Sequence, residues 1–163
     1  MFRTFVRRLV WITLTLCCMG STAPFAQNHT TIKTYPDGAF ALGFTHIVNT
    51  PGGILYYNRD TGAGAVGTLD AGTGTHTTLK VYAPGAFATG FTQIVSTPGG
   101  ILYYNGTTGA GAIGRLDAAG NHTTLKLFPA GAFATGWTRI VSTPTGILFY
   151  NGQTGAGAVG RIQ

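Results

Sequence analysis

The stretch HTTLKVYAPGAFATGFTQIVSTPGGILYYNGTTGAGAIGRLD, from His76 to Asp117, occurs in this chain in three nearly identical copies. The first copy begins at His29 and the last at His122, so the starts lie 47 and then 46 residues apart. Over 42 aligned positions, the first and middle copies share 31 residues and the middle and last share 30. A fixed period of this length is typical of units that stack on copies of themselves. We therefore expect the functional surface to be formed by the three stacked copies together.

The sequence divides into two predicted parts, a signal peptide and a repeat domain. Residues 1–26 are predicted to be a secretory signal peptide, because three arginines precede the apolar run Leu9–Gly20 and small residues follow it. That run is too short to span a bilayer comfortably. Residues 27–163 are predicted to form one domain of three repeats, 29–75, 76–121 and 122–163. We therefore expect a protein that is secreted or held at the cell surface.

Both cysteines of the chain, Cys17 and Cys18, lie in the predicted signal peptide. They are either ordinary residues of its apolar run, or one of them is lipidated after cleavage as in a bacterial lipoprotein. Leu16 before Cys17 is larger than that processing normally accepts. In either case the mature domain holds no cysteine, so no disulfide is expected to support it.

The charge of the chain argues against a nucleic-acid partner. The formal net charge is +6, but Arg3, Arg7 and Arg8 lie in the predicted signal peptide and leave seven Lys and Arg against four Asp. That excess is too small and too scattered for a nucleic-acid surface. The chain has no Glu and only 9% charged residues, so Thr, Ser, Asn, Gln and backbone groups must supply the surface polarity. Such a surface suits neutral ligands.

Each repeat divides into four short segments of strand character. In the middle copy these are Gly90–Thr97, Ile101–Tyr104, residues 109–117 and His76–Tyr82, separated by Pro-Gly-Gly and Asn-Gly turn sequences. In the last of these segments, Leu79 and Val81 are predicted to share one face. No window has a sustained 3.6-residue apolar period, and Gly and Pro interrupt every candidate helix. The chain is predicted to be all-β.

Four strands in about 46 residues match the size of one β-propeller blade. A solenoid or a three-fold β-trefoil has repeats of similar length. A propeller fits the phase better, because His29–Tyr35 reads as a fourth strand and the last copy stops after its third strand at Arg161-Ile162. The N-terminal strand of one chain could then complete the last blade of another and close a ring without a free edge. We expect a homo-oligomer, with a dimer of six blades, or else a chain that forms part of a larger ring.

The pair of segments GWTRIV (Gly136–Val141) and GILFYN (Gly146–Asn151) resembles the repeat of the tachylectin family of β-propeller lectins. The resemblance covers all three copies and implies a secreted, non-enzymatic propeller that binds N-acetylated amino sugars at repeated sites. This chain departs from the family in two ways. Phe44 and Phe91 replace the tryptophan in two copies, and the family ring has five blades where this chain encodes three.

Two recurring patterns have a functional interpretation that their sequence context opposes. The series Gly109, Gly111 and Gly114 spells G-x-G-x-x-G, but no helix follows it, so close packing between strands is favoured over a dinucleotide site. His29, His76 and His122 recur at one repeat position, so they should be spread over different blades and cannot meet at one metal ion. We expect them to be exposed at the starts of outer strands.

The sequence offers few residues that could catalyse a reaction. The only carboxylates are Asp37, Asp60, Asp70 and Asp117, whereas a glycoside hydrolase needs two that face one bond. Asp70 and Asp117 occupy equivalent turn positions, where Asp usually bonds to its own backbone. We therefore expect no enzyme activity, no cofactor and no catalytic residue.

What remains is a neutral surface rich in aromatic and amide groups. Aromatic faces can stack on the apolar side of a pyranose, and amides can pair with hydroxyl or acetamido groups. Aromatic residues in a blade are also common core residues, and Asn before Gly is a common turn. The last copy is the strongest candidate, because Trp137, Arg139 and Arg161 add a larger ring and charged donors. The predicted ligand-binding residues are Phe44, Tyr57, Asn58, Phe91, Tyr104, Asn105, Trp137, Arg139, Tyr150 and Asn151.

These features favour a multivalent lectin for neutral or N-acetylated sugars, since several weak sites on one body raise avidity for clustered ligands. The alternative is a structural or adhesive repeat module that binds protein partners, or its own kind, through aromatic and Gly-rich surface.

Overall fold

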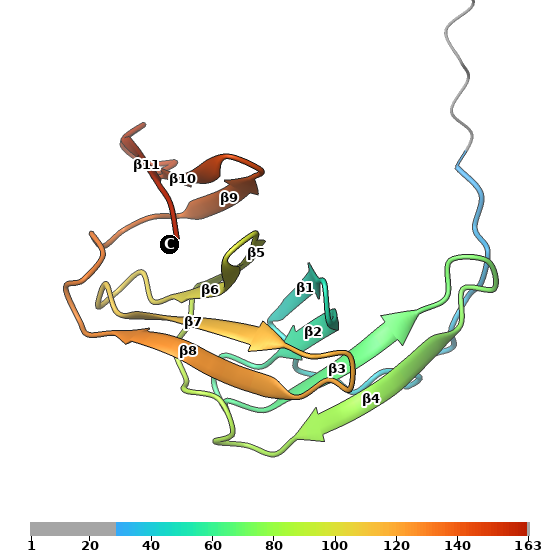
Figure 1. Ribbon diagram of the computed structural model, residues 1–163. Coiled ribbons are helices and arrows are strands. Elements are labelled where there is room, and N and C mark those ends of the chain that lie inside the picture. Colours follow the sequence, from blue (N-terminus) through green and yellow to red (C-terminus); the bar gives the residue numbers. More distant parts are fainter. Residues whose placement is uncertain (1–28, 163) are drawn as a thin grey trace, which may run out of the picture. The chain divides into compact units, whose positions relative to one another are not determined.

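The computed structural model describes residues 29–162, and the predicted signal peptide lies outside the described residues (Figure 1). Within residues 29–162 the chain forms eleven strands and no helix, so the prediction of an all-β chain is confirmed. The strands are β1 His46–Thr50, β2 Gly53–Tyr57, β3 Gly64–Leu69, β4 His76–Tyr82, β5 Gln93–Thr97, β6 Gly100–Tyr104, β7 Gly111–Leu116, β8 His122–Phe128, β9 Arg139–Thr143, β10 Gly146–Tyr150 and β11 Gly157–Gly160.

The strands form three antiparallel sheets, and each of the first two takes its outer strand, β4 or β8, from the start of the next repeat. The first sheet has the order β1-β2-β3-β4, the second β5-β6-β7-β8, and the third β9-β10-β11. Within a sheet each strand pairs with the one before it in the chain, because the turns between them are short. The register repeats too: Ile47 lies opposite Tyr56 in the first sheet, and Ile94 lies opposite Tyr103 in the second. The four predicted segments of the middle repeat are therefore confirmed, with the first and third strands shorter than expected.

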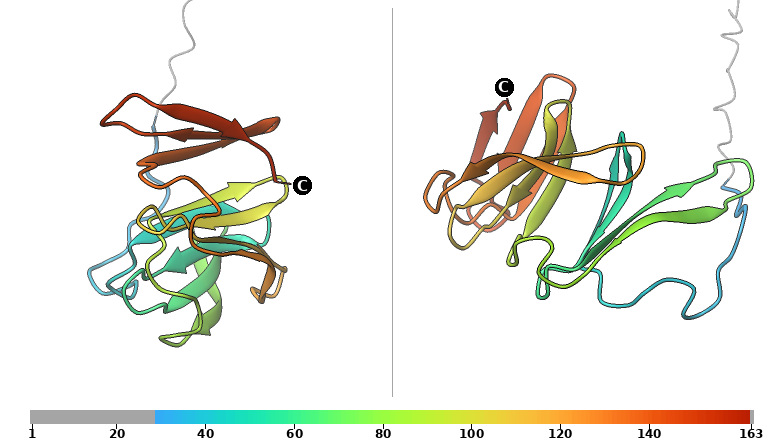
Figure 2. Two further views of the ribbon diagram at one scale, coloured as in Figure 1. Left: turned by 90° about the vertical axis from the view of Figure 1, so that its left-hand side faces the viewer. Right: turned by 60° about the horizontal axis from the view of Figure 1, so that its bottom comes forward.

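Successive sheets contact one another through their first strands. Strand β5 lies between β1 and β9, as the two views of Figure 2 also show. One apolar cluster joins the first and second sheets and is centred on Leu55, Tyr57 and Tyr103. A second cluster joins the second and third sheets and includes Leu102, Tyr104 and Phe149. The core is thus shared between neighbouring sheets, as expected for repeats that cannot bury an apolar face alone.

One prediction about the outer strands is wrong, and the predicted N-terminal strand does not form within a single chain. His29–Tyr35 forms no strand, because no strand of the described residues lies beside it. It lies instead near the turn between β3 and β4, where the Tyr35 hydroxyl donates to the Gly74 carbonyl oxygen at 2.6 Å. In β4, Leu79 is half-buried but Val81 is exposed, because the register shifts between Val66 and Gly67 and a β-bulge breaks the alternation.

The glycines of the G-x-G-x-x-G series pack closely between strands, as predicted. A Cβ at Gly111 would lie 2.7 Å from the Tyr103 carbonyl oxygen and 2.8 Å from a ring carbon of Phe133. A Cβ at Gly114 would collide with the His122 imidazole. These positions lie in or beside β7 and precede no helix, so the close packing itself accounts for the glycines.

Of the recurring histidines, His76 and His122 begin β4 and β8 as expected, but the prediction that these two are exposed is wrong, whereas His29 is exposed as predicted. His76 and His122 are half-buried, and the Nε2 atom of each is buried without a hydrogen-bond partner in the described part of the chain. The glycine opposite each ring leaves the space that the imidazole fills. Burial lowers the pKa of His122 below its ordinary value.

Candidate functional site

The hairpin turns between the first and second strands of each sheet have one design. A threonine hydroxyl at the end of the first strand donates to the glycine carbonyl oxygen three residues later. The distance is 2.6 Å for Thr50 to Gly53, 2.6 Å for Thr97 to Gly100 and 3.0 Å for Thr143 to Gly146. Because these bonds fix the turns, each sheet presents a rigid Thr-Pro corner at the same end.

Neighbouring corners enclose a cleft between the first and second sheets. Its volume is about 330 Å³, at the lower end of the range for small-molecule sites. Arg115 and Leu116 from the end of β7 and Leu125 from β8 form the wall opposite the corners. The lining residues are Thr50, Pro51, Gly52, Thr97, Pro98, Gly99, Gly100, Ile101, Arg115, Leu116, Ala118 and Leu125.

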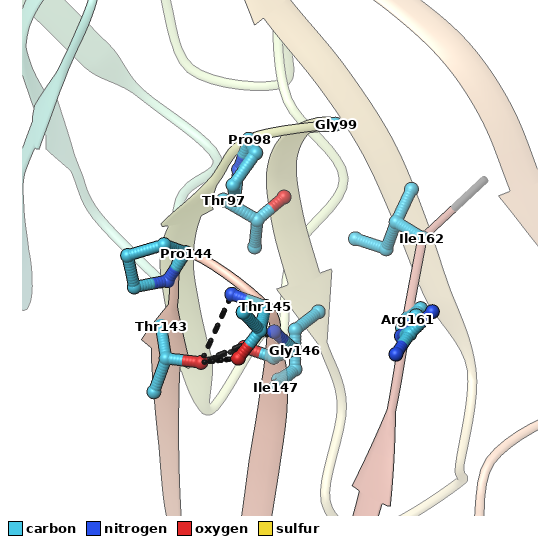
Figure 3. Close-up of a pocket in the computed structure, with 10 residues that line it drawn as sticks. All are labelled: Thr97, Pro98, Gly99, Thr143, Pro144, Thr145, Gly146, Ile147, Arg161 and Ile162. Carbon is cyan, nitrogen blue, oxygen red and sulfur yellow. Dashed lines mark hydrogen bonds between the residues drawn. The ribbon is translucent and has the colours of Figure 1, made fainter.

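The equivalent cleft recurs between the second and third sheets, with a volume of about 120 Å³ (Figure 3). Arg161 and Ile162, just after β11, take the places that Arg115 and Leu116 have in the first cleft. Within the cleft the Gly146 amide donates to the Thr143 hydroxyl at 3.1 Å. The lining residues are Thr97, Pro98, Gly99, Thr143, Pro144, Thr145, Gly146, Ile147, Arg161 and Ile162.

The lining of the two clefts combines hydrogen-bonding groups with apolar surface. Threonine hydroxyls and backbone carbonyls offer acceptors, one arginine in each cleft offers donors, and proline and isoleucine offer apolar surface. Among the described residues that line them, neither cleft has a carboxylate or an imidazole. Only the first cleft reaches the volume of a small-molecule site, and the lining of both clefts offers no acid–base pair.

The aspartates at the equivalent turns bond to their own loops, as predicted. Asp70 accepts from the Thr73 amide at 2.7 Å, and this bond together with one from the Thr73 hydroxyl lowers the pKa of Asp70. Asp117 accepts from the Asn121 side chain at 2.9 Å and from its amide at 2.8 Å, which lowers the pKa of Asp117. In residues 29–162 no three His, Cys, Asp or Glu side chains are grouped so that they could hold a metal ion.

The predicted asparagines hold the turns between the second and third strands of each sheet. The Oδ1 atom of Asn105 accepts from the amides of Thr107 and Thr108 at 3.0 and 3.1 Å. Asn58 and Asn151 make the same pair of bonds in their repeats. The Nδ2 atom of Asn58 also donates to the Gly43 carbonyl oxygen at 2.7 Å. The Oδ1 atoms of all three asparagines thus accept from backbone amides, and the three residues lie outside the two clefts.

The predicted aromatic residues lie mainly where sheets meet. Tyr57 and Tyr104 are fully buried, and burial raises the pKa of both hydroxyls. Phe91 is buried in the cluster between the first two sheets. Their equivalents differ in environment, because Phe44 and Tyr150 are at least partly exposed.

Only some of the residues predicted to bind a ligand in the third repeat lie close together. Trp137 and Arg161 both line a hollow of about 290 Å³ on the third sheet, with Phe133, Phe149 and Val159. Arg139 is not among the residues of that hollow, and its guanidinium donates to the Thr138 carbonyl oxygen at 2.7 Å. None of the ten predicted residues lines the clefts between sheets.

Sequence reasoning missed the Thr-Pro corners and Arg115 as lining of a cleft. The signal was present, because T-P-x-G occurs in all three repeats and Arg115 aligns with Arg161. The cleft was not recognised because a Pro-Gly turn predicts only the pairing of its own two strands. It does not predict that the turn of the next sheet lies beside it.

Comparison with protein-family models, with curated proteins and with solved structures gives no match to this chain. In residues 29–162 no helix has the length and apolar character that crossing a membrane would require.

Proposed function

We propose that this chain is a secreted, non-enzymatic lectin that binds neutral or N-acetylated sugars at several equivalent sites. The observation that carries the proposal is the recurrence of one cleft at two successive sheet contacts, each with the same corner residues and an equivalent arginine. A pyranose offers hydroxyl groups to such hydroxyl, guanidinium and carbonyl partners, and an apolar face to Pro and Ile. The low charge of the domain agrees with a neutral ligand.

The architecture proposed for this lectin is a β-propeller whose four-stranded blades are the repeats. The contact of each first strand with the next supports a radial arrangement of the sheets, since in a propeller the blades surround a central axis. The tachylectin-like repeat pattern supports the same reading. The ring is completed by a second copy of the chain, so that two copies contribute six blades.

A glycan array tests the function with the chain that begins at residue 27, which contains all described residues. We expect binding to arrayed neutral or N-acetylated sugars, weakened at least tenfold by Arg115→Ala together with Arg161→Ala. The matched control is Arg59→Ala, since Arg59 is an exposed arginine in a β2–β3 turn outside the clefts. A folded protein that binds no glycan would remove the proposal.

The same array separates the clefts from the hollow on the third sheet. If Trp137→Ala abolishes binding while the double arginine variant binds normally, the assignment of the sugar to the clefts is wrong. Circular dichroism of each variant must match the parent, so that a loss of binding reports the site and not unfolding.

A structural or adhesive module is the second candidate, and a specific observation favours it. Val81 and Leu127 are large apolar side chains that project from the outer strands β4 and β8 and are about three-quarters exposed. Apolar side chains in such positions suit a protein partner. Replacement of both by Thr should leave glycan binding unchanged if the chain is a lectin, and should abolish adhesion if it is an adhesive module.

A further inference from the structure

The contact between successive sheets is a repeated knob and socket. The knob is the last residue of the second strand, Tyr57 in the first sheet. Its ring lies 6.1 Å from that of Phe87 and 6.0 Å from that of Phe91, both of which precede the second sheet. The Tyr57 hydroxyl donates to the Ala88 carbonyl oxygen at 2.8 Å. The next contact repeats the arrangement, with the Tyr104 hydroxyl 2.8 Å from the Ala134 carbonyl oxygen.

The third sheet carries a knob with no socket in the described residues. Tyr150 is 41% exposed, whereas its equivalents Tyr57 and Tyr104 are 0% exposed. The same holds for its neighbours: Leu148 is 43% exposed against 0% for Leu55, and Val159 is 80% exposed against 0% for Val66. These side chains are of the same types as the core residues of the first sheet. They are more exposed because no further sheet of the described residues covers them.

The first sheet carries a socket that no knob of the described residues fills. Phe40 is 38% exposed, whereas its equivalent Phe87 is 6% exposed. A hollow of about 140 Å³ is lined there by Phe40, Ala41, Phe44 and Tyr56, among others. The socket is already formed, because Phe44 lies 5.3 Å from Tyr56, the distance found for the equivalent pair in the filled socket of the second sheet.

The N-terminal segment lies where the outer strand of a preceding sheet would lie. The Tyr35 hydroxyl accepts from the His76 amide at 2.6 Å, as the Tyr82 hydroxyl of β4 accepts from the His122 amide at 2.7 Å. Its sequence TIKTY, Thr31–Tyr35, aligns with TLKLF of β8. In the third sheet, β11 pairs with β10 and has no strand on its other edge in the described part of the chain.

A polar side chain at the start of each first strand also reaches the next sheet. The Nε2 atom of His46 lies 3.1 Å from the Thr92 carbonyl oxygen, and the Nε2 atom of Gln93 donates to the Thr138 carbonyl oxygen at 3.1 Å. Arg139 holds the same position in the third sheet and is exposed. Its length and charge allow it to reach a carbonyl of a further sheet.

We propose that the third sheet of this chain binds head to tail to the first sheet of a second copy, and that two such contacts close a ring of two chains. Tyr150 enters the socket of Phe40, Phe44 and Tyr56 and donates to the Ala41 carbonyl oxygen. Such a heterologous contact closes when the rotation between copies permits. The occupant is a second copy because the knob Tyr150 repeats Tyr57 and Tyr104, and the socket of Phe40, Phe44 and Tyr56 repeats that of Phe87, Phe91 and Tyr103.

The same contact supplies the missing outer strand of the third sheet. In the second sheet Gly111 pairs with Phe128, Ala112 with Leu127 and Ile113 with Lys126. The equivalent pairs join Gly157 to Tyr35, Ala158 to Thr34 and Val159 to Lys33 of the second copy. Leu125 of β8 lines the first cleft, so Ile32 of the second copy would line the cleft beside Arg161. This last consequence rests on the proposed function, whereas the contact itself does not.

Molar mass tests the contact. Light scattering on the chain from residue 27 should give twice the chain mass, and Tyr150→Arg or Phe40→Arg should each give a monomer with an unchanged circular dichroism spectrum. The matched control is Thr123→Arg, an exposed residue of β8 outside the knob, the socket and the adhesive candidates Val81 and Leu127. An equimolar mixture of the two monomeric variants should recover a dimer, because one intact knob and one intact socket remain.

A crosslink tests the strand register. The double variant Val159→Cys with Lys33→Cys should form an intermolecular disulfide, because opposed residues of antiparallel strands lie within disulfide distance. Val159→Cys paired with an exposed cysteine at Gly72 is the control and should not crosslink.

The outcomes that overturn the contact are distinct from those that overturn the function. A parent protein that stays monomeric at high concentration, a dimer that survives both arginine variants, or a mixture that stays monomeric would overturn the head-to-tail contact. An assembly larger than two chains would overturn closure by two copies. A dimer that binds no glycan would remove the lectin and leave the contact.

Discussion

The Tyr104 hydroxyl makes two hydrogen bonds across the contact between the second and third sheets. It donates to the Ala134 carbonyl oxygen at 2.8 Å and accepts from the Trp137 amide at 3.3 Å. The neighbouring tyrosine, Tyr103, is almost as deeply buried, yet its hydroxyl has no hydrogen-bond partner among the described residues. Of these two adjacent tyrosines in β6, Tyr104 therefore has a hydrogen-bonded hydroxyl, whereas Tyr103 buries a hydroxyl without a partner, which costs stability.

Tyr104→Phe should destabilise the protein, because it removes the donor of a buried bond and leaves the Ala134 carbonyl unpaired. The expected loss in the free energy of unfolding is about 1–3 kcal/mol. Tyr103→Phe should be neutral or stabilising, because it removes a buried polar group without a partner. The third repeat already has Phe149 at the position of Tyr103. Urea denaturation of both variants measures the difference, and equal losses would contradict it.

Stability should fall on acidification through the titration of His122. Its folded-state pKa is lowered by burial, so below about pH 6.5 the unfolded chain binds a proton that the folded chain resists. The contribution is complete above the unfolded pKa and is lost as the pH falls towards the folded value. Thermal unfolding from pH 7.5 to 5 should show this loss, with a smaller slope in His122→Gln. An NMR titration that places the pKa of His122 above 6.5 would contradict the prediction.

Gly114→Ala should be one of the most destabilising small substitutions in the chain. The added Cβ collides with the His122 ring, which is held against Phe87 at 4.9 Å and Tyr103 at 5.6 Å between ring centres. Overpacking of this kind costs about 1–3 kcal/mol. Gly72→Ala is the control, because a Cβ there has no contact closer than 3.5 Å. Melting temperatures that fall equally for both variants would show that the ring moves aside freely.

Asn105→Ala should reduce stability without a specific effect on sugar binding. The substitution removes the acceptor of two loop amides, which costs about 1 kcal/mol per bond. Asn105→Asp keeps the acceptor and should recover most of the loss. Urea denaturation gives the stability, and the glycan array at a temperature where both variants are folded gives the binding. A lost glycan signal in folded Asn105→Ala would place this amide in the site.

The local pattern of the sequence predicted the all-β class and the four segments of the middle repeat. It did so because the turn sequences and β-branched runs lie within one repeat, where neighbouring strands pair. It did not predict that Val81 is exposed, because the bulge opposite Val66 depends on how two strands twist together. The strand over His29–Tyr35 also failed, since a strand exists only beside a partner.

The candidate site was harder to predict than the fold, because its walls come from different repeats. Asn105 looked like a ligand donor in the sequence, but its acceptor serves its own turn. Tyr57 and Phe91 were correctly recognised as recurring aromatic positions, and the structure uses them at the contact between sheets. Arg161 was recognised as a donor because of its charge, whereas the recurrence of arginine at 115 and 161 had not been connected with a cleft.

The knob and socket have a consequence for how such a gene can change in length. Every repeat carries the Tyr knob on one side and the matching socket on the other. An extra repeat produced by unequal crossing-over would therefore be complementary to both of its neighbours. Gain or loss of a whole unit would leave each remaining boundary intact and would change the number of clefts between neighbouring sheets. Such a change in length would require no new contact surface.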